Sequence, residues 1–287
     1  MDDNIPRQPA PLGSVESHAH LLDVPPDGQL LYKMMTIENL LRSIQDGYLY
    51  FNRVDSYADF PDADQHDGRQ LPADQQLNAS VWFEKAPDFS MENYFDQSRA
   101  RTYACCFSLE NSAHIWCQYE NRSEKGNVCV VFDFSKLRAK LNQTLQPGNA
   151  ALKYGDNLCR QIFLINYGII KYVEWDRHRA NTAHLPNPIE YTYLKNEKYS
   201  NEKELRISLI PSTFGMGQFV LRDGSTMSFP TSLQMDFDFK AAIVDGTAPQ
   251  ILCEQDCDIG SLYSELQKLG ILPGEGSDLP LHNKVST

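Results

Sequence analysis

The segment NVCVVFDF, at residues 127–134, is the clearest strand signal in the chain. It is a short run rich in β-branched and aromatic residues, which fit the pleated surface of a sheet. Comparable short segments recur along most of the sequence. We expect strands at residues 29–35, 48–54, 101–111, 127–134, 167–174, 205–210 and 237–246. Short strands distributed in this way predict a fold that is built around one sheet.

Segments with helical periodicity separate these strands at irregular intervals. Residues 36–46 carry apolar side chains at helical spacing, with Thr36 placed as the N-cap and Gly47 just beyond the last turn. We also expect helices at residues 135–145, 190–204 and 259–270. No glycine-rich phosphate loop follows a strand, and the elements do not form a clean alternating series. The pattern therefore predicts an α+β fold with a mixed, mostly antiparallel sheet and peripheral helices.

Composition predicts a single domain with polar segments at both ends. Residues 1–28 are rich in Pro, Gly and Asp, and we interpret them as a flexible leader. Residues 29–272 form the predicted domain, and residues 273–287 a polar tail. Within the domain, residues 54–80 are acidic and poor in apolar side chains. This acidic excursion predicts a long loop, and such loops in compact domains are usually functional or mobile.

Charge and hydropathy argue against two kinds of partner, extended nucleic acid and a membrane. The 287 residues carry a net charge of -12, which argues against broad electrostatic capture of nucleic acid but leaves room for a local basic groove. No apolar run approaches the roughly 20 residues of a membrane span, so we expect no membrane partner. The N-terminus lacks the basic start and apolar stretch of a secretory signal. We therefore expect a cytoplasmic location.

The cysteines indicate a reduced protein without a metal site. There are seven, an odd number, and four of them stand in apolar, strand-like surroundings. A free cysteine in such a setting behaves as a small hydrophobe. Cys253 and Cys257 form a pair in CEQDC, but no second pair accompanies them as structural zinc would require. We expect no bound metal.

The stretch YSNEKELRISLI, residues 199–210, places two glutamates at the start of an apolar strand. Glu202 and Glu204 are separated by one residue, and Arg206 follows inside the strand. A buried arginine needs a partner, and Glu204 would lie on the same face of the strand. Glutamates at a strand end are most often solvated and form surface ion pairs. Two interpretations stay open here, a structural ion pair and a functional carboxylate.

Four segments in order resemble the domain of unknown function 2971 family of bacteria. They are LLYKMMTIENLLRSIQDGYLYFNRVDSYAD, CCFSLENSAHIWCQYENRSEKGNVCVVFD, KNEKYSNEKELRIS and FKAAIVDG. The resemblance as a whole runs from about residue 30 to about residue 270. The layout is more distantly similar to DarT-like ADP-ribosyltransferases. ENLLRSIQDGYL is similar to their opening helix, and KELRISL to their late strand. Tyr32 and Lys33 stand where those enzymes commonly carry a histidine.

The second resemblance implies an ADP-ribosyltransferase-like fold and transfer of ADP-ribose from NAD, in a bacterial toxin or anti-phage effector. That reaction breaks the nicotinamide–ribose bond and develops positive charge on the sugar. A fixed carboxylate stabilises this charge more in the transition state than in the ground state. We assign that role to Glu204 and expect Glu202 to position the acceptor, if both residues are already extended. The acceptor would be nucleic acid or protein, and an antitoxin would be a further partner.

The remaining site residues follow from the same resemblance. We expect Ser108 and Trp116 to line the nicotinamide pocket, Tyr32 and Tyr119 to form further walls, and Arg53 to contact the NAD phosphates. NAD would be a substrate, and no metal would take part. Trp116 and Tyr32 have an alternative role in core packing, and the alternative for Ser108 is that it only ends a strand.

Two other classes of function compete with this one. A non-enzymatic binding or immunity-type module of the same fold would use the acidic excursion against a basic partner. A hydrolase or nuclease would gather Asp55, Asp59, Asp62 and Asp64 around a divalent ion, although their spacing matches no calcium loop.

Overall fold

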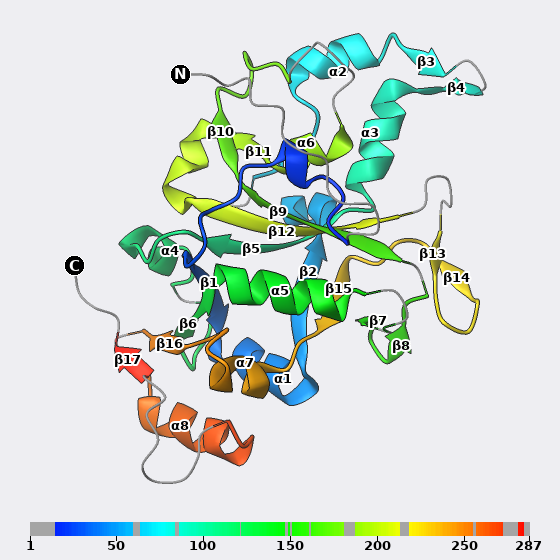
Figure 1. The fold of residues 1–287 in the computed structure, drawn as a ribbon. Helices are drawn as coiled ribbons and strands as arrows, with labels where there is room; N and C mark the ends of the chain where they lie inside the picture. The colour runs from blue at the N-terminus through cyan, green and yellow to red at the C-terminus, as the bar shows by residue number, and fades with distance from the viewer. Residues whose placement is uncertain are drawn as a thin grey trace.

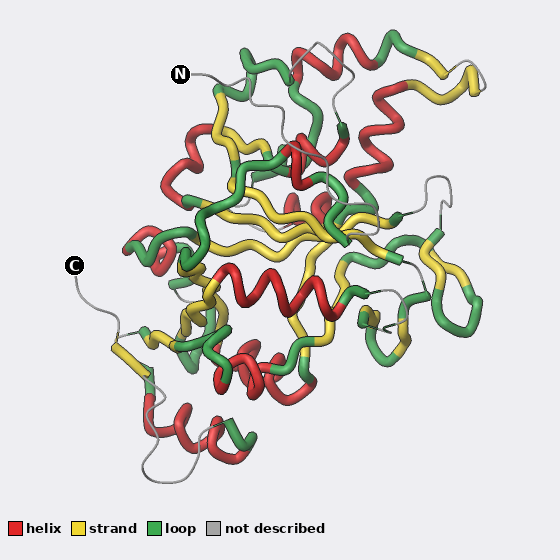
Figure 2. The backbone as a smooth tube through the Cα atoms, viewed as in Figure 1, coloured by secondary structure: helices red, strands yellow, loops and turns green. Residues whose placement is uncertain are grey.

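The structure is a computed structural model of the chain. It describes residues 15–59, 64–83, 86–120, 122–146, 149, 151–160, 162–180, 187–212, 218–254, 257–271 and 281–283. These residues form one domain with a central sheet between two groups of helices (Figures 1 and 2). The predicted α+β class and the mostly antiparallel sheet are therefore confirmed.

The main sheet branches at its central strand, β5 (Tyr103–Ser108). Along one side, β5 pairs with β12 (Glu204–Pro211), which in turn pairs with β9 (Phe163–Ile169). Along its other side, β5 pairs at its start with β2 (Tyr48–Arg53) and at its end with β1 (Leu30–Thr36). β1 and β2 therefore diverge as they leave β5, and all four of these pairings are antiparallel.

Each branch of the sheet continues outward from β1 or β2. Beyond β1 lie β6 (Asn127–Asp133), β16 (Gln250–Cys253) and β17 (Leu281–Asn283). Beyond β2 lie β15 (Ser232–Asp236), β7 (Leu152–Tyr154) and β8 (Asn157–Leu158). Within the described part of this sheet, β16 and β17 make the one parallel pairing.

Two groups of helices cover opposite faces of the sheet (Figure 1). One face packs into the main hydrophobic core with α1 (Ile37–Asp46), α5 (Phe134–Thr144), α7 (Phe239–Val244) and α8 (Ile259–Lys268). The other group comprises α2 (Pro72–Asn78), α3 (Met91–Arg99) and α6 (Pro188–Thr192), which share a second, smaller core. The short helix α4 (Ala113–Cys117) follows β5.

Smaller elements complete the fold. They are the 3-10 helices η1 (Ala19–Leu21), η2 (Val54–Asp59) and η3 (Glu197–Glu202), and the short strands β3 (Trp82–Phe83), β4 (Ala86–Ser90), β10 (Lys171–Val173), β11 (Leu194–Asn196), β13 (Phe219–Val220) and β14 (Thr226–Met227). Within the described parts of the chain, no helix is both long and apolar enough to cross a membrane.

The capping prediction for α1 is confirmed in detail. The Thr36 side chain accepts a hydrogen bond from the backbone N–H of Asn39, as an N-cap does. Gly47 ends the helix with a φ of 65°, in the left-handed region where glycine avoids the steric cost of a Cβ atom.

Two predicted elements are wrong. Residues 237–246, expected to be a strand, contain helix α7 instead, because the Asp238 side chain accepts from the N–H of Ala241 and so caps a helix. Residues 190–204, expected to be one helix, divide into α6, β11 and η3. The Asn196 side chain accepts from the N–H of Lys198 and thereby starts η3 as a separate element.

The predicted leader, the acidic excursion and the predicted polar tail each contribute to the folded domain. In the predicted leader, Val15 and Leu22 are buried and Glu16 forms an ion pair with Arg138 at 2.6 Å. The second half of this segment therefore packs on the body of the protein, while residues 1–14 lie outside the described residues. The acidic excursion contains η2 and α2. In the predicted polar tail, only residues 281–283 are described, and they form β17.

Candidate functional site

Three of the predicted site residues lie side by side across adjacent strands. Ser108, the last residue of β5, is paired with Tyr32 of β1 on one side and with Glu204 of β12 on the other. Residues directly opposite each other in a sheet point to the same face. Tyr32, Ser108 and Glu204 therefore form one row, although up to 172 residues separate them in the sequence.

Glu204 is a buried member of an ionic network. Its Oε1 accepts a hydrogen bond from Arg206 Nε at 2.8 Å, and its Oε2 from Lys195 Nζ at 3.2 Å. The thiol of Cys106 also bonds to this carboxylate. The structural ion pair between Glu204 and Arg206, left open by the sequence, is therefore present.

Arg206 is completely buried and joins the acidic excursion to the sheet. Its Nη1 and Nη2 donate to the two carboxylate oxygens of Asp67, at 2.6 and 3.0 Å. Nη1 also donates to the carbonyl oxygen of Thr192 at 2.7 Å. A bidentate pair of this kind fixes both partners in orientation as well as distance. The acidic excursion thus supplies a structural counter-ion to the centre of the fold.

The charges in the network set the pKa values of its members. Burial alone would raise the pKa of Glu204, but Arg206 and then Lys195 outweigh burial and lower it to about 2. Burial would lower the pKa of Lys195, but Glu204, Asp67 and Glu202 raise it well above its ordinary value. Both groups are therefore charged at neutral pH.

Glu202 differs from Glu204 in position and exposure. It ends η3 rather than starting β12, and Lys203 between them has a left-handed φ of 46°, so the expected extended pair is wrong. Its Oε2 nevertheless accepts from Lys195 Nζ at 2.5 Å, and its Oε1 from Gln118 Nε2 at 3.3 Å. Burial and the nearby charge of Glu204 raise the pKa of Glu202, although Lys195 opposes them.

Glu202 is the most accessible member of the network. Exposed side-chain fractions are 16% for Glu202, 9% for Lys195, 7% for Glu204, 5% for Asp67 and 0% for Arg206. Three carboxylates face two cations, which leaves one unbalanced negative charge. That charge is best accommodated at the solvated edge, where Glu202 lies.

Ser108 holds the backbone near Glu202. Its Oγ lies 2.9 Å from the carbonyl oxygens of both Glu110 and Glu202, and it accepts from the N–H of Glu110 at 3.2 Å. One hydroxyl proton serves these two carbonyl groups. The geometry therefore gives Ser108 a positioning role, rather than leaving its hydroxyl available for a nicotinamide amide.

The predicted aromatic residues divide between core and rim. Trp116 is buried, with 2% of its surface exposed, and its Nε1 donates to the Asn111 side chain at 2.8 Å. It packs in a small core cluster, so it does not line an open pocket as predicted. Tyr32 and Tyr119 are only partly buried and pack against that cluster. They remain candidates for the walls of a binding site.

Arg53 is at the wrong end of the sheet for its predicted role. It pairs with Tyr103 at the start of β5, and Ser108 lies five residues further along, about 16 Å at the usual rise of a strand. Its guanidinium donates to Asp55 at 2.5 Å and to the carbonyl oxygen of Phe229. It is therefore already paired, far from the row.

Lys33 is a nearer cation, which the sequence reasoning did not select. It lies where β1 and β2 diverge, and its Nζ donates to the carbonyl oxygen of Cys106 at 3.2 Å. The ammonium is also 5.1 Å from the centre of the Phe107 ring. Among the described residues, no carboxylate forms an ion pair with it.

The described carboxylates do not support a metal centre. No group of three His, Cys, Asp or Glu side chains within the described ranges could hold a metal ion. Asp55 is paired with Arg53, and Asp64 is buried and accepts from the N–H of His66. Asp62 and the side chain of Asp59 lie outside the described residues. All seven cysteines are free thiols.

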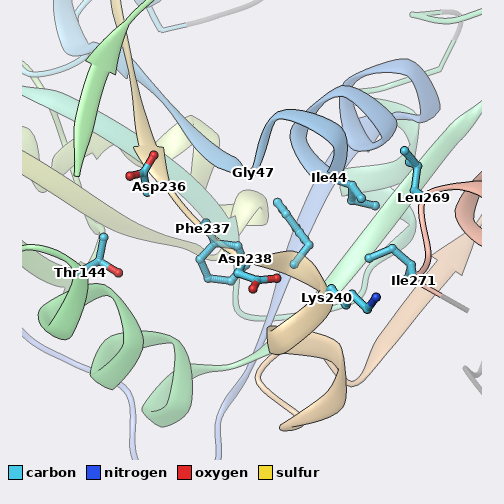
Figure 3. A pocket seen from close by; sticks show the side chains of 10 residues that line it. Ile44, Gly47, Thr144, Asp236, Phe237, Asp238, Lys240, Leu269 and Ile271 are labelled. Carbon is cyan, nitrogen blue, oxygen red and sulfur yellow. The ribbon is translucent and has the colours of Figure 1, made fainter. Parts of the chain in front are cut away.

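A described cavity of about 510 Å³ lies away from this network (Figure 3). Its walls come from the ends of α1, α5 and β15, the start of α7, and the residues after α8. Figure 3 shows Asp236 and Thr144 on one side of the cavity, and Leu269 and Ile271 on the other. None of the predicted site residues lines it.

Comparison of the chain with protein-family models, with curated proteins and with solved structures gives no match.

Proposed function

We propose that the chain is an NAD-dependent ADP-ribosyltransferase in which Glu202, rather than Glu204, faces the ribose. The observation that supports this most strongly is the row of Tyr32, Ser108 and Glu204 across three strands, with Glu202 at its solvated end. The ends of paired strands inside a sheet are a rigid mount for groups that must be held to within a fraction of an ångström.

The charge distribution suits the chemistry. When the nicotinamide–ribose bond breaks, its electron pair leaves with the nicotinamide and positive charge develops on the sugar. The unbalanced negative charge at Glu202 would stabilise that transition state. The acceptor then attacks the anomeric carbon and loses a proton, and a carboxylate with a raised pKa is better suited to take it.

Each neighbour has a distinct task in this proposal. Lys195 contacts both glutamates and fixes their separation, and Glu204 anchors Lys195 through its own pairing with Arg206. Tyr32 and the face of Tyr119 that Arg122 does not cover are the proposed ring faces for the nicotinamide. Lys33, which follows Tyr32 in β1, replaces Arg53 as the cation proposed for the phosphates of NAD.

Part of the acidic excursion is unsuited to the binding-module alternative. Asp64, Asp67 and Asp74 of the acidic excursion are buried, so these carboxylates do not offer a surface to a basic partner. The proposed setting as a bacterial toxin or anti-phage effector depends on the resemblance alone. The acceptor would be nucleic acid or protein.

Incubation with NAD tests the proposal. The purified protein is mixed with NAD labelled on its adenylate phosphate and with RNA, DNA or protein, and both nicotinamide release and label transfer are measured. We expect transfer to one acceptor class and its loss in Glu202→Gln. Glu197→Gln, an exposed change in the same 3-10 helix, is the matched control and should remain active. A folded wild-type protein that releases no nicotinamide and transfers no label would overturn the proposal.

A further inference from the structure

Arg99 has a buried donor without a hydrogen-bond partner. Its Nε donates to the carbonyl oxygen of Asp67 at 2.7 Å, while its Nη2 is buried and unpaired within the described structure. Most buried donors are satisfied, and an exception calls for an absent water or ligand. An acceptor is therefore missing beside Arg99.

A second arginine, Arg69, directly follows Gly68, which packs against the Arg99 side chain. Burial, followed by the positive charge of Arg69, lowers the pKa of Arg99. Neither guanidinium forms an ion pair with any described carboxylate. Two adjacent unpaired arginines are unexpected in a chain with a net charge of -12, because acidic partners are abundant. An anion between them would relieve their repulsion.

Three carboxylates, those of Asp55, Asp67 and Asp96, act on Arg99 without a hydrogen bond to its Nη2. Asp55 is bound by Arg53 at 2.5 Å, and Asp67 by Arg206 at 2.6 Å. Asp96 accepts from the Gln70 side chain at 3.5 Å. None of them provides an acceptor for the free Nη2.

The arginine is held rigidly in this position. A Cβ atom on Gly68 would lie 2.5 Å from Val54 Cγ1 and 3.5 Å from Arg99 Cγ, and Gly68 has a φ of 68°. The turn at residues 65–68 therefore packs closely over the Arg99 side chain. Arg99 ends α3, and the helix dipole favours a cation there, but the dipole supplies no acceptor for Nη2.

We propose that Arg69 and Arg99 form a binding site for a phosphate group. The planar guanidinium fork matches phosphate oxygens, and a preorganised pair of arginines is typical of phosphate recognition. The phosphate belongs either to a nucleic acid strand or to a free phosphate compound. Asp67 contacts Arg99 through its carbonyl group and Arg206 through its carboxylate, so the phosphate site and the glutamate network share one segment.

If the site binds a nucleic acid strand, the idea that this strand accepts ADP-ribose rests on the proposed function. Phosphate binding itself does not depend on that function. Binding is therefore measured without NAD. A fluorescent single-stranded oligonucleotide is titrated with the wild-type protein at several salt concentrations, and inorganic phosphate is added as a competitor. Because no NAD is present, the assay reports on binding of the oligonucleotide whether or not the catalytic proposal holds.

The variants are Arg69→Gln, Arg99→Gln and Arg99→Lys. Loss of a charge-assisted contact should weaken strand binding about tenfold or more and reduce the salt slope by about 0.7 for each lost phosphate contact. Arg99→Lys keeps the charge but loses the fork, and should bind with intermediate strength. Arg222→Gln, an exposed change in a distant turn, should leave binding unchanged. Arg69 is exposed, so its variant should fold even if Arg99→Gln does not.

The outcomes are distinct. Strand binding that inorganic phosphate displaces only weakly assigns the site to nucleic acid. Equal displacement by inorganic phosphate assigns it to a free phosphate compound. If folded Arg69→Gln and Arg99→Lys bind both probes as the wild type does, or if neither probe binds the wild type, the phosphate site is overturned.

Discussion

The two faces of β12 are equally buried but chemically opposite. One face presents Leu205, Ile207 and Leu209 to the main core beneath α5. The other presents Glu204, Arg206 and Ser208, and of these Arg206 and Ser208 have no exposed surface. Alternation along a single strand places a hydrophobic core and an ionic network on either side of the same backbone.

The two faces differ in what they contribute: the apolar face contributes mainly stability, and the polar face mainly fixed side-chain positions. Burial of aliphatic side chains stabilises the fold with little directional demand. Burial of an ion pair carries a desolvation cost that can exceed the attraction between the charges, and apolar replacements of such networks are often as stable. The polar face is thus an inefficient way to hold a sheet together, but it fixes Lys195 and the backbone leading to Glu202. We infer that the polar face serves the site.

Loss of Arg206 from the polar face should have the largest effect on the free energy of unfolding. Arg206→Met leaves Asp67 buried without its counter-ion and Glu204 with Lys195 alone, and should lower the free energy of unfolding by about 3–5 kcal/mol. Urea unfolding followed by circular dichroism measures the change. The triple variant Asp67→Asn, Glu204→Gln, Arg206→Met removes the charges together and should recover much of the loss. A single variant within 1 kcal/mol of the wild type would argue against a tightly coupled network.

Acid should weaken the polar face specifically. Glu204 has a pKa lowered to about 2 from 4.5, so its contribution to stability is complete above its unfolded value and disappears as pH falls towards 2. That contribution is roughly 3 kcal/mol. Glu202, with a raised pKa, acts in the opposite direction and offsets part of it.

Unfolding free energies measured across this pH range test the assignment. Glu204→Gln should flatten the acid dependence as well as lower stability at neutral pH. An unchanged pH dependence in that variant would assign the acid sensitivity to other groups.

The apolar face should respond modestly and without effect on function. Ile207→Val removes one methylene from the core face and should cost about 0.5–1.5 kcal/mol. Because Ile207 adjoins Arg206 but points away from the network, nicotinamide release should match that of the wild type. A loss of activity comparable with that of Glu202→Gln would show that the two faces are not functionally separate.

Local signals in the sequence predicted much of this arrangement. The spacing of two residues placed Glu204 and Arg206 on the same face of the strand, and the need of a buried arginine for a partner pointed to Glu204. Thr36 and Gly47 marked the ends of α1. These predictions depend on neighbouring residues, for which spacing in the sequence determines spacing in the structure.

Long-range partners and local backbone changes escaped prediction. Asp67 is 139 residues from Arg206, and nothing in its surroundings distinguishes it from the other acids of the excursion. The left-handed turn at Lys203, which separates the roles of Glu202 and Glu204, has no glycine or asparagine to mark it. Residues 237–246 were predicted to be a strand because of their aliphatic run. Asp238, which caps α7, was the signal in the sequence for a helix.

The central claim is that the two glutamates have separate tasks, structure for Glu204 and chemistry for Glu202. The most direct measurement compares nicotinamide release from NAD by Glu202→Gln and by the wild type, with unfolding by urea measured on the same samples. We predict that Glu202→Gln keeps its stability within about 1 kcal/mol of the wild type, as for a partly exposed pair, and loses activity about 100- to 1000-fold. A folded Glu202→Gln protein that releases nicotinamide at the wild-type rate would contradict the account.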